Sequence, residues 1–190
     1  MINTSSLNPL KTDRLLLRKL ERSDIDSAAI IHGDPATNIH NPTGARSRAA
    51  TEALLDNWVG FWEQHHFGYW TVCDLKKTDE VLGFGGVMRK QIGDITGLNM
   101  YFRFAATAWG RGYATEMANA ALHAAFTVLD EAAVYGLVRP ANTASRRTLE
   151  RIGMQLFTET DDVPGEPASL IYRISRNDYL QMKPLTPEAI

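Results

Sequence analysis

The sequence contains one cysteine, Cys73, so no internal disulfide can form, and this favours a reducing compartment. It has no run approaching the roughly 18 apolar residues of a membrane span. Residues 1–10 show no basic stretch leading into an apolar run, so we expect no secretory signal. Neither charge sign is in clear excess, because 20 basic and 22 acidic residues give a net charge of −2. This balance argues against a nucleic acid or an anionic membrane as the main partner, but it allows a local basic pocket for a phosphorylated small molecule. We therefore expect a soluble, cytoplasmic protein.

Repeats, low-complexity tracts and Pro/Gly-rich linkers are also missing, which predicts a single domain. Hydrophobic residues make up 44% of the chain, enough for a sizeable core, and charged residues make up 22%, as in ordinary globular proteins. We assign residues 1–9 to an N-terminal extension, 10–182 to the domain and 183–190 to a C-terminal tail.

The apolar pattern predicts strands and helices in one mixed domain. Expected strands cover residues 15–20, 69–75, 81–89, 98–104, 132–138, 154–160 and 169–175. Ser23-Asp24 is expected to cap a first helix. Further helices are expected over 47–65, over 114–129, and from Asn142 or Thr143 to a terminal Gly153. The fold class is therefore α/β or α+β with a mixed sheet.

The most informative stretch joins the strand over 98–104 to the helix over 114–129. It reads Trp109-Gly110-Arg111-Gly112-Tyr113-Ala114-Thr115-Glu116. Glycines let successive backbone N–H groups turn toward one centre, and the positive end of the helix dipole adds to this nest for a pyrophosphate, with Arg111 as reinforcement. The alternative is that both glycines only permit a tight turn. A P-loop is excluded because Gly-Lys-Ser/Thr is absent, and a dinucleotide fingerprint fails because Thr115 stands at its third glycine.

Three segments, in order, resemble the GNAT (general N-acetyltransferase) superfamily. The glycine stretch resembles the Trp-Gly-Lys/Arg-Gly-Tyr-Ala-Thr-Glu form found in the subgroup of ribosomal-protein N-terminal (alanine/serine) acetyltransferases. Residues 10–18, Leu-Lys-Thr-Asp-Arg-Leu-Leu-Leu-Arg, resemble its opening strand. Residues 142–154, with Asn142, Ser145 and Leu-Glu-Arg-Ile-Gly-Met, resemble its later helix. The resemblance covers residues 10–178.

This resemblance implies binding of acetyl-CoA on a mixed, mostly antiparallel sheet that is splayed between its fourth and fifth strands. The pantetheine arm would pair with the backbone near Phe102–Phe104, and the pyrophosphate would lie on the stretch from Trp109 through Gly110, Arg111, Gly112, Tyr113 and Ala114 to Thr115. Asn142 would bond the pantetheine arm, and Ser145 would face the thioester. Arg147 is a candidate for a CoA phosphate, against the alternative of a solvated surface arginine. Glu116 is expected to gain from the helix dipole and to fix the loop.

Two departures from the superfamily pattern affect catalysis. Asn99 stands where many members have a general-base glutamate, and it cannot take a proton. Leu149 stands where many have a general-acid tyrosine. Ser145 is then the remaining candidate to donate a hydrogen bond to the sulfur, against the alternative that it only packs or caps. Backbone N–H groups at the splayed strand can stabilise the oxyanion without any special side chain.

The resemblance predicts an N-acetyltransferase in which a primary amine attacks the thioester directly. The leading acceptor is a protein or peptide N-terminal α-amine. Alternatives are a small amine, such as an antibiotic or polyamine, and a non-catalytic acyl-CoA-binding domain. The loops over 33–48 and 161–168 are expected to set the acceptor. Four histidines lie in or near the segments that border the acceptor pocket: His32, His40, His65 and His66. One of these histidines could titrate near neutral pH, but their spacing supports no metal site. The oligomeric state is left as monomer or homodimer.

Overall fold

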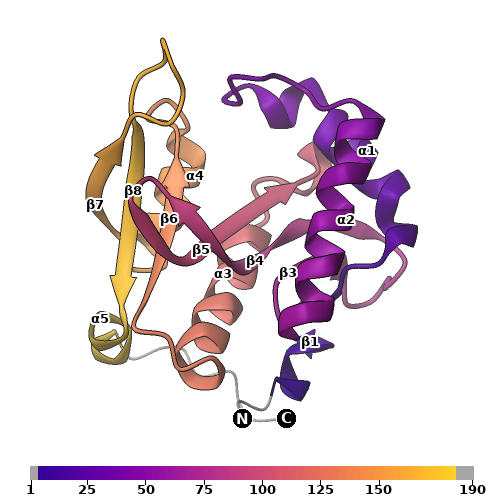
Figure 1. The fold of residues 1–190 in the computed structure, drawn as a ribbon. Coiled ribbons are helices and arrows are strands. Elements are labelled where there is room, and N and C mark those ends of the chain that lie inside the picture. Colours follow the sequence, from indigo (N-terminus) through magenta and orange to yellow (C-terminus); the bar gives the residue numbers. More distant parts are fainter. Residues whose placement is uncertain (1–3, 183–190) are drawn as a thin grey trace.

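A sheet of eight strands in the order β1-β2-β3-β4-β5-β6-β8-β7 forms the centre of the protein (Figure 1). The computed structural model describes residues 4–182, so the tail expected over 183–190 and the first three residues lie outside the described part. The strands are β1 (Leu10–Lys11), β2 (Leu15–Lys19), β3 (Tyr69–Asp74), β4 (Val81–Ile92), β5 (Ile95–Phe104), β6 (Ala133–Val138), β7 (Gln155–Thr160) and β8 (Ser169–Ser175). The α-helices are α1 (Ile25–Gly33), α2 (Arg48–His65), α3 (Tyr113–His123), α4 (Thr143–Arg151) and α5 (Arg176–Gln181).

Strands β1 to β5 pair antiparallel in sequence order, and β6, β8 and β7 form a second antiparallel group. The two groups meet where β5 runs parallel to β6. The predicted fold class, a mostly antiparallel mixed sheet with flanking helices, is confirmed. So is the hairpin of β3 and β4, although β4 and β5 are longer than expected and are joined by a tight turn at Gly93, whose φ is 57°.

The helices lie on both faces of the sheet. Figure 1 shows α1 and α2 on one side of β3–β5, and α3 and α4 on the other. Helix α2 buries Leu55, Trp58 and Trp62 against the sheet, the face that the spacing predicts. Helix α3 packs on β4 and β5 through buried residues that include Met117 and Ala121. Both layers belong to one apolar core that includes most of the sheet.

The helix expected over 114–129 is present over 113–128, but its last part is a π-helix and not an α-helix. Helix α3 ends at His123, and residues 124–128 form a π-helical turn in which the N–H of Leu129 donates to the carbonyl of Ala124. The Thr127 hydroxyl donates to the carbonyl of His123 at 2.7 Å, so a side chain occupies an acceptor near the start of this turn. The apolar pattern continues through the π turn, and for that reason periodicity alone did not reveal it.

Asp24 closes a capping box with Glu21 at the turn over 22–24, just before α1, and its carboxylate has a further role. It stands at the N-cap of α1, but its carboxylate makes no cap bond there. It accepts hydrogen bonds from Arg18 on β2, from the Thr71 hydroxyl on β3 at 2.8 Å and from the Glu21 N–H at 2.9 Å. Burial acts to raise the pKa of Asp24, and these hydrogen bonds outweigh burial, so the pKa lies below its ordinary value. A buried carboxylate thus fastens the start of α1 to two strands.

Other local predictions agree with the structure or add to it. Asn142 caps α4 by accepting from the Ser145 N–H, and Gly153 follows the helix with a φ of 87°. Helix α5 was not predicted, although Ser175 and Asp178 form a capping box that the sequence contains. Within residues 4–9, Leu7 is buried and its carbonyl accepts from the Trp70 indole. None of the helices within residues 4–182 is both long and apolar enough to cross a bilayer.

Replacing Asp24 with Asn should lower the free energy of unfolding at pH 7 by about 3 kcal/mol, because Arg18 loses its partner in a largely buried pair. Urea denaturation measures the change. Asp26→Asn is the control, since Asp26 pairs with Arg48 on the surface. A loss for Asp24→Asn no larger than that of the control contradicts the assignment. The difference between wild type and Asp24→Asn should shrink below about pH 4, as pH falls through the lowered pKa.

Candidate functional site

The sheet opens between β5 and β6. The two strands pair at only two positions, Leu98 with Val134 and Asn99 with Tyr135. Beyond them β6 continues to pair with β8, and β5 continues to pair with β4. Within the described chain, residues 100–104 of β5 therefore have no strand partner on the side of β6. This is the expected splay, which lies between the fifth and sixth strands here because the two-residue β1 is counted.

The glycine stretch lies at the C-terminal end of β5, as predicted. Gly110 and Gly112 have φ values of 72° and 79°, the left-handed conformation that favours glycine. Among the residues that the structure describes, the N–H groups of residues 110–112 have no hydrogen-bond acceptor. Gly112 is the N-cap of α3 and supplies no side-chain cap, so the first amides of α3 are also available. Trp109 is half exposed, and its indole donates to the Phe104 carbonyl.

Glu116 joins this loop to the segment between β1 and β2. It accepts from the Thr12 hydroxyl at 2.6 Å and from the Arg14 N–H at 2.8 Å, and it forms an ion pair with the Arg14 guanidinium at 2.6 Å. Arg14 also donates to the carbonyl of Arg111, and both arginines lie over the buried ring of Tyr113. The expected loop-fixing role of Glu116 thus has a geometric basis. Arg14 was not predicted as a site residue, although it belongs to the Thr-Asp-Arg-Leu segment that carried part of the resemblance.

Helix α4 begins after β6, at the same end of the opening as the glycine stretch, and it contacts α3. The Asn142 carbonyl oxygen is used by the cap, while its amide N–H groups have no partner in the described chain. The Ser145 hydroxyl is half-buried and likewise lacks a hydrogen-bond partner among residues 4–182. Arg147 is exposed, and Leu149 is buried and packs beside Gly136 of β6. Asn142 and Ser145 are therefore free for further hydrogen bonds.

On the opposite face of β5, side chains point toward α1 and α2. Asn99 is buried and donates to the Tyr69 hydroxyl at 2.8 Å. Burial raises the pKa of Tyr69, so this phenol is neutral at physiological pH. Neither group can take a proton from a substrate. In place of a carboxylate at position 99, the protein thus has a neutral hydrogen-bonded pair, Asn99 and Tyr69.

His32 on α1 is fully buried beside Trp58 and Phe84. Its Nδ1 lies 2.9 Å from the carbonyl of Ala28, which can only accept, so Nδ1 carries the proton. Nε2 then accepts from the Tyr101 hydroxyl at 3.0 Å. Burial lowers the pKa of His32 to about 4, so it does not titrate near neutral pH. This corrects, for His32, the expectation of a histidine useful at neutral pH.

The two loops expected to set the acceptor face each other across a hollow of about 430 Å³. Its walls come from the loop after α1, from the segment just before Asn142 and from the loop between β7 and β8. The lining residues are Ile39, His40, Asn41, Pro42, Arg139, Pro140, Ala141, Glu166 and Pro167. Arg139 pairs with both Asp162 and Glu166, at 3.2 and 3.5 Å. The hollow thus borders the N-terminus of α4 and carries charges that are already paired.

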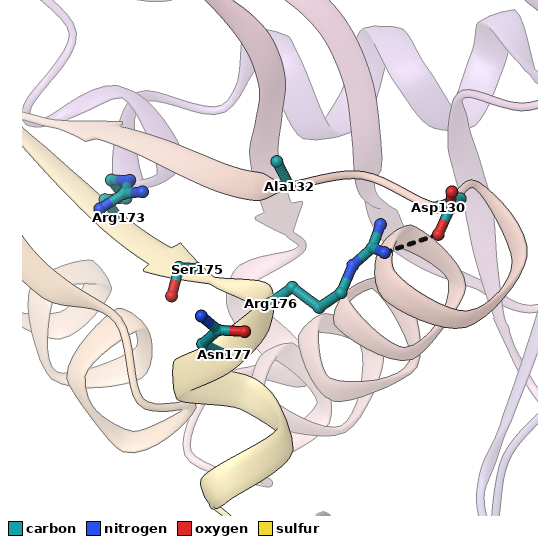
Figure 2. A pocket seen from close by; sticks show the side chains of 6 residues that line it. All are labelled: Asp130, Ala132, Arg173, Ser175, Arg176 and Asn177. Carbon is teal, nitrogen blue, oxygen red and sulfur yellow. Dashed lines mark ion pairs between the residues drawn. The ribbon is translucent and has the colours of Figure 1, made fainter.

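A second hollow, of about 450 Å³, lies at the other end of β6 and β8 (Figure 2). Figure 2 shows the Arg176 guanidinium turned toward Asp130, with which it pairs at 2.6 Å. Arg176 also donates twice to the carbonyl of Glu131. None of the predicted site residues lines this hollow. We therefore place the candidate site at the opening between β5 and β6.

Comparison with known proteins gives a family and two informative relatives. The profile described as Acetyltransferase (GNAT) domain matches residues 14–155. The uncharacterized protein YkkB of Bacillus subtilis is 31% identical over 173 residues, covering 88% of this chain and 96% of its own. The FsC-acetyl coenzyme A-N(2)-transacetylase of Aspergillus fumigatus is 29% identical over 156 residues, covering 79% of this chain and 62% of its own length.

Solved structures share the fold at low sequence identity. A GNAT-family acetyltransferase from Bacillus anthracis has a TM-score of 0.74 at 22% identity, covering 88% of this chain and 98% of that one. A putative ribosomal-protein-serine acetyltransferase from Vibrio cholerae has a TM-score of 0.68 at 16% identity, covering 88% and 97%. A spermidine N-acetyltransferase chimera from Vibrio cholerae has a TM-score of 0.68 at 21% identity, covering 87% and 98%.

Stability should fall as pH decreases from 6.5 to 4, because the unfolded chain then binds a proton at residue 32 that folded His32 excludes. At pH 5 this costs about 2 kcal/mol relative to pH 7. Urea unfolding at pH 7, 6 and 5 should show a smaller pH dependence in His32→Gln than in wild type. His40→Gln, at an exposed histidine, is the control for the loss of an imidazole. An unchanged pH dependence in His32→Gln contradicts the prediction.

Proposed function

The chain belongs to the GNAT acetyltransferase family, and we propose that it transfers the acetyl group of acetyl-CoA to the α-amine of a protein or peptide N-terminus. The observation that carries the proposal is the sheet opening, which combines the unpaired edge of β5 with a loop of unpaired amides at its end. A pantetheine chain contains amides that need backbone partners, and a pyrophosphate needs converging N–H donors. The described residues fit both requirements.

On the cofactor side, acetyl-CoA would supply an activated thioester carbonyl. The edge of β5 near Phe102 and Phe104 would hold the pantetheine arm, and its N–H groups would stabilise negative charge on the carbonyl oxygen. Residues 109–115 would hold the pyrophosphate. The free amide of Asn142 would bond the pantetheine arm, the Ser145 hydroxyl would donate to the sulfur, and Arg147 would approach a CoA phosphate.

On the acceptor side, the amine would enter through the hollow between residues 39–42 and 166–167. Its proton must leave before attack, directly or through water. Asn99 and Tyr69 are neutral, and the carboxylates of Asp162 and Glu166 are paired with Arg139. Because asparagine stands at the usual position of the base, the site favours amines that are easily deprotonated, which supports an α-amine over a lysine side chain.

A polyamine is the second candidate acceptor. The loop over residues 161–168 contains three acidic residues, Asp161, Asp162 and Glu166, and no basic residue. Such a loop attracts a polycation, although Arg139 offsets part of its charge. The spermidine N-acetyltransferase with the same fold makes this candidate worth testing. A domain that binds acetyl-CoA without turnover is the outcome expected if no amine is acetylated.

Gly112→Val should weaken CoA binding by about tenfold or more, because a β-branched residue disfavours the left-handed backbone and the loop loses a charge-assisted hydrogen bond. Calorimetric titration of the folded variant with CoA measures the change. Gly165→Val is the matched control, since Gly165 has a φ of 80°, open space around its Cβ position and no place at the cofactor side. Equal CoA affinity for wild type and Gly112→Val excludes this loop as the pyrophosphate site.

The enzyme should prefer an α-amine to a lysine side chain at pH 7. Their reference pKa values, near 8 and 10.4, differ by about 2.4 units, or roughly 3 kcal/mol of deprotonation cost at neutral pH. Specificity constants are compared for one peptide with either a free N-terminus or only a free lysine, and for spermidine, at several pH values. A clear lysine preference at pH 7 refutes the α-amine proposal. A spermidine preference over both peptides selects the second candidate.

A further inference from the structure

Arg14 uses most of its hydrogen-bonding donors within the protein. Its N–H and Nε donate to Glu116 at 2.8 and 2.7 Å, and its Nη2 lies 2.6 Å from the same carboxylate. Its Nη1 donates to the backbone carbonyl of Arg111 at 2.8 Å. The guanidinium therefore bonds Glu116 on α3 and, at the same time, the middle of the glycine loop. Its forked donor geometry allows both contacts at once.

The contact with Arg111 fixes the direction of a peptide group. In a trans peptide, the carbonyl of one residue and the N–H of the next point in opposite directions. Arg14 holds the Arg111 carbonyl, so the Gly112 N–H points away from Arg14. That N–H is one of the loop amides without an acceptor in the described chain. Gly110 and Gly112, on either side of Arg111, have positive φ. Little surrounds their Cβ positions, so few other contacts hold this peptide plane in place.

We propose that Arg14 is a positioning residue for the pyrophosphate of CoA, which it serves by holding the Arg111 carbonyl so that the Gly112 N–H faces the phosphate. The inference rests on the proposed function, because it assumes that CoA lies on this loop. Glu116 and Thr12 act with it: the carboxylate anchors the guanidinium, and the Thr12 hydroxyl donates to the same carboxylate at 2.6 Å. The Tyr113 ring, 4.8 Å below the guanidinium, limits its movement.

Two simpler roles for Arg14 make different predictions. A surface ion pair, with the arginine side chain half exposed, would contribute little to any ligand. If Arg14 acted only through its positive charge on the phosphates, lysine could replace it without loss. A positioning role requires the fork itself, because lysine cannot donate to Glu116 and to the Arg111 carbonyl in the same geometry. Arg14→Lys therefore separates charge from geometry.

The test compares CoA with a ligand that keeps the pantetheine arm but lacks the pyrophosphate and the nucleotide. Calorimetry gives the affinity of wild type, Arg14→Lys and Arg14→Ala for CoA and for S-acetylpantetheine, which lacks the pyrophosphate and the nucleotide. We expect both variants to lose about tenfold in CoA affinity, the effect of one charge-assisted hydrogen bond, and to keep wild-type affinity for S-acetylpantetheine. Arg22→Ala is the control, since it removes the charge of an exposed arginine that pairs with Asp56.

The outcomes are distinct. Full CoA affinity in Arg14→Lys overturns the positioning role in favour of simple charge. Unchanged CoA affinity in both variants overturns any role for Arg14 in binding. An equal loss for both ligands, with a lowered melting temperature, assigns Arg14 to general stability and also overturns the proposal. If wild type binds neither ligand, the proposed function fails, whatever the variants show. If Arg14→Ala does not fold, Arg14→Lys still decides.

Discussion

The two-residue parallel contact between β5 and β6 is the constraint on which the rest of the structure depends. It joins an antiparallel group of five strands to one of three, and it leaves the rest of the β5 edge without a strand partner. Unpaired backbone groups inside a protein are costly unless water or a ligand bonds them. The packing of α3 on β4 and β5, and of α4 on β6, keeps the two groups together while they diverge. The opening is therefore held by elements on one face of the sheet and remains available for a ligand.

Glu116 links the start of α3 to the segment between β1 and β2. Its carboxylate bonds residues 12 and 14, which lie more than one hundred positions earlier in the chain. This contact ties the first strands to the start of α3, so the glycine loop depends on tertiary structure as well as on its own glycines. The helix dipole would favour a carboxylate in this first turn even without a partner. The three hydrogen bonds and one ion pair to residues 12 and 14 show that Glu116 also fixes one segment against another.

Prediction from the sequence succeeded where local chemistry decides the structure. The apolar face of α2, the Asn142 cap of α4 and the hairpin of β3 and β4 follow from spacing, capping chemistry and turn residues. It failed where a distant partner decides. Asp24 does close a capping box with Glu21, but the bonds of its carboxylate to Arg18 and Thr71 could not be predicted from local chemistry. The expected site segments, residues 109–115 and 142–147, do lie at one end of the opening, whereas the peptide plane that Arg14 fixes could not be read from sequence spacing.

Several polar groups near the opening are already bonded within the protein. Asn99 donates to Tyr69, Asp162 and Glu166 pair with Arg139, and the neutral His32 imidazole accepts the hydrogen bond of the Tyr101 hydroxyl. By contrast, the backbone amides of residues 110–112, the Asn142 amide and the Ser145 hydroxyl are among the cofactor-side donors that have no partner within residues 4–182. The described residues thus offer hydrogen-bond donors for a cofactor, while position 99 offers no carboxylate to take a proton. In such a site, orientation and stabilisation of negative charge are available for rate enhancement, and the acceptor's own basicity affects how readily it loses its proton.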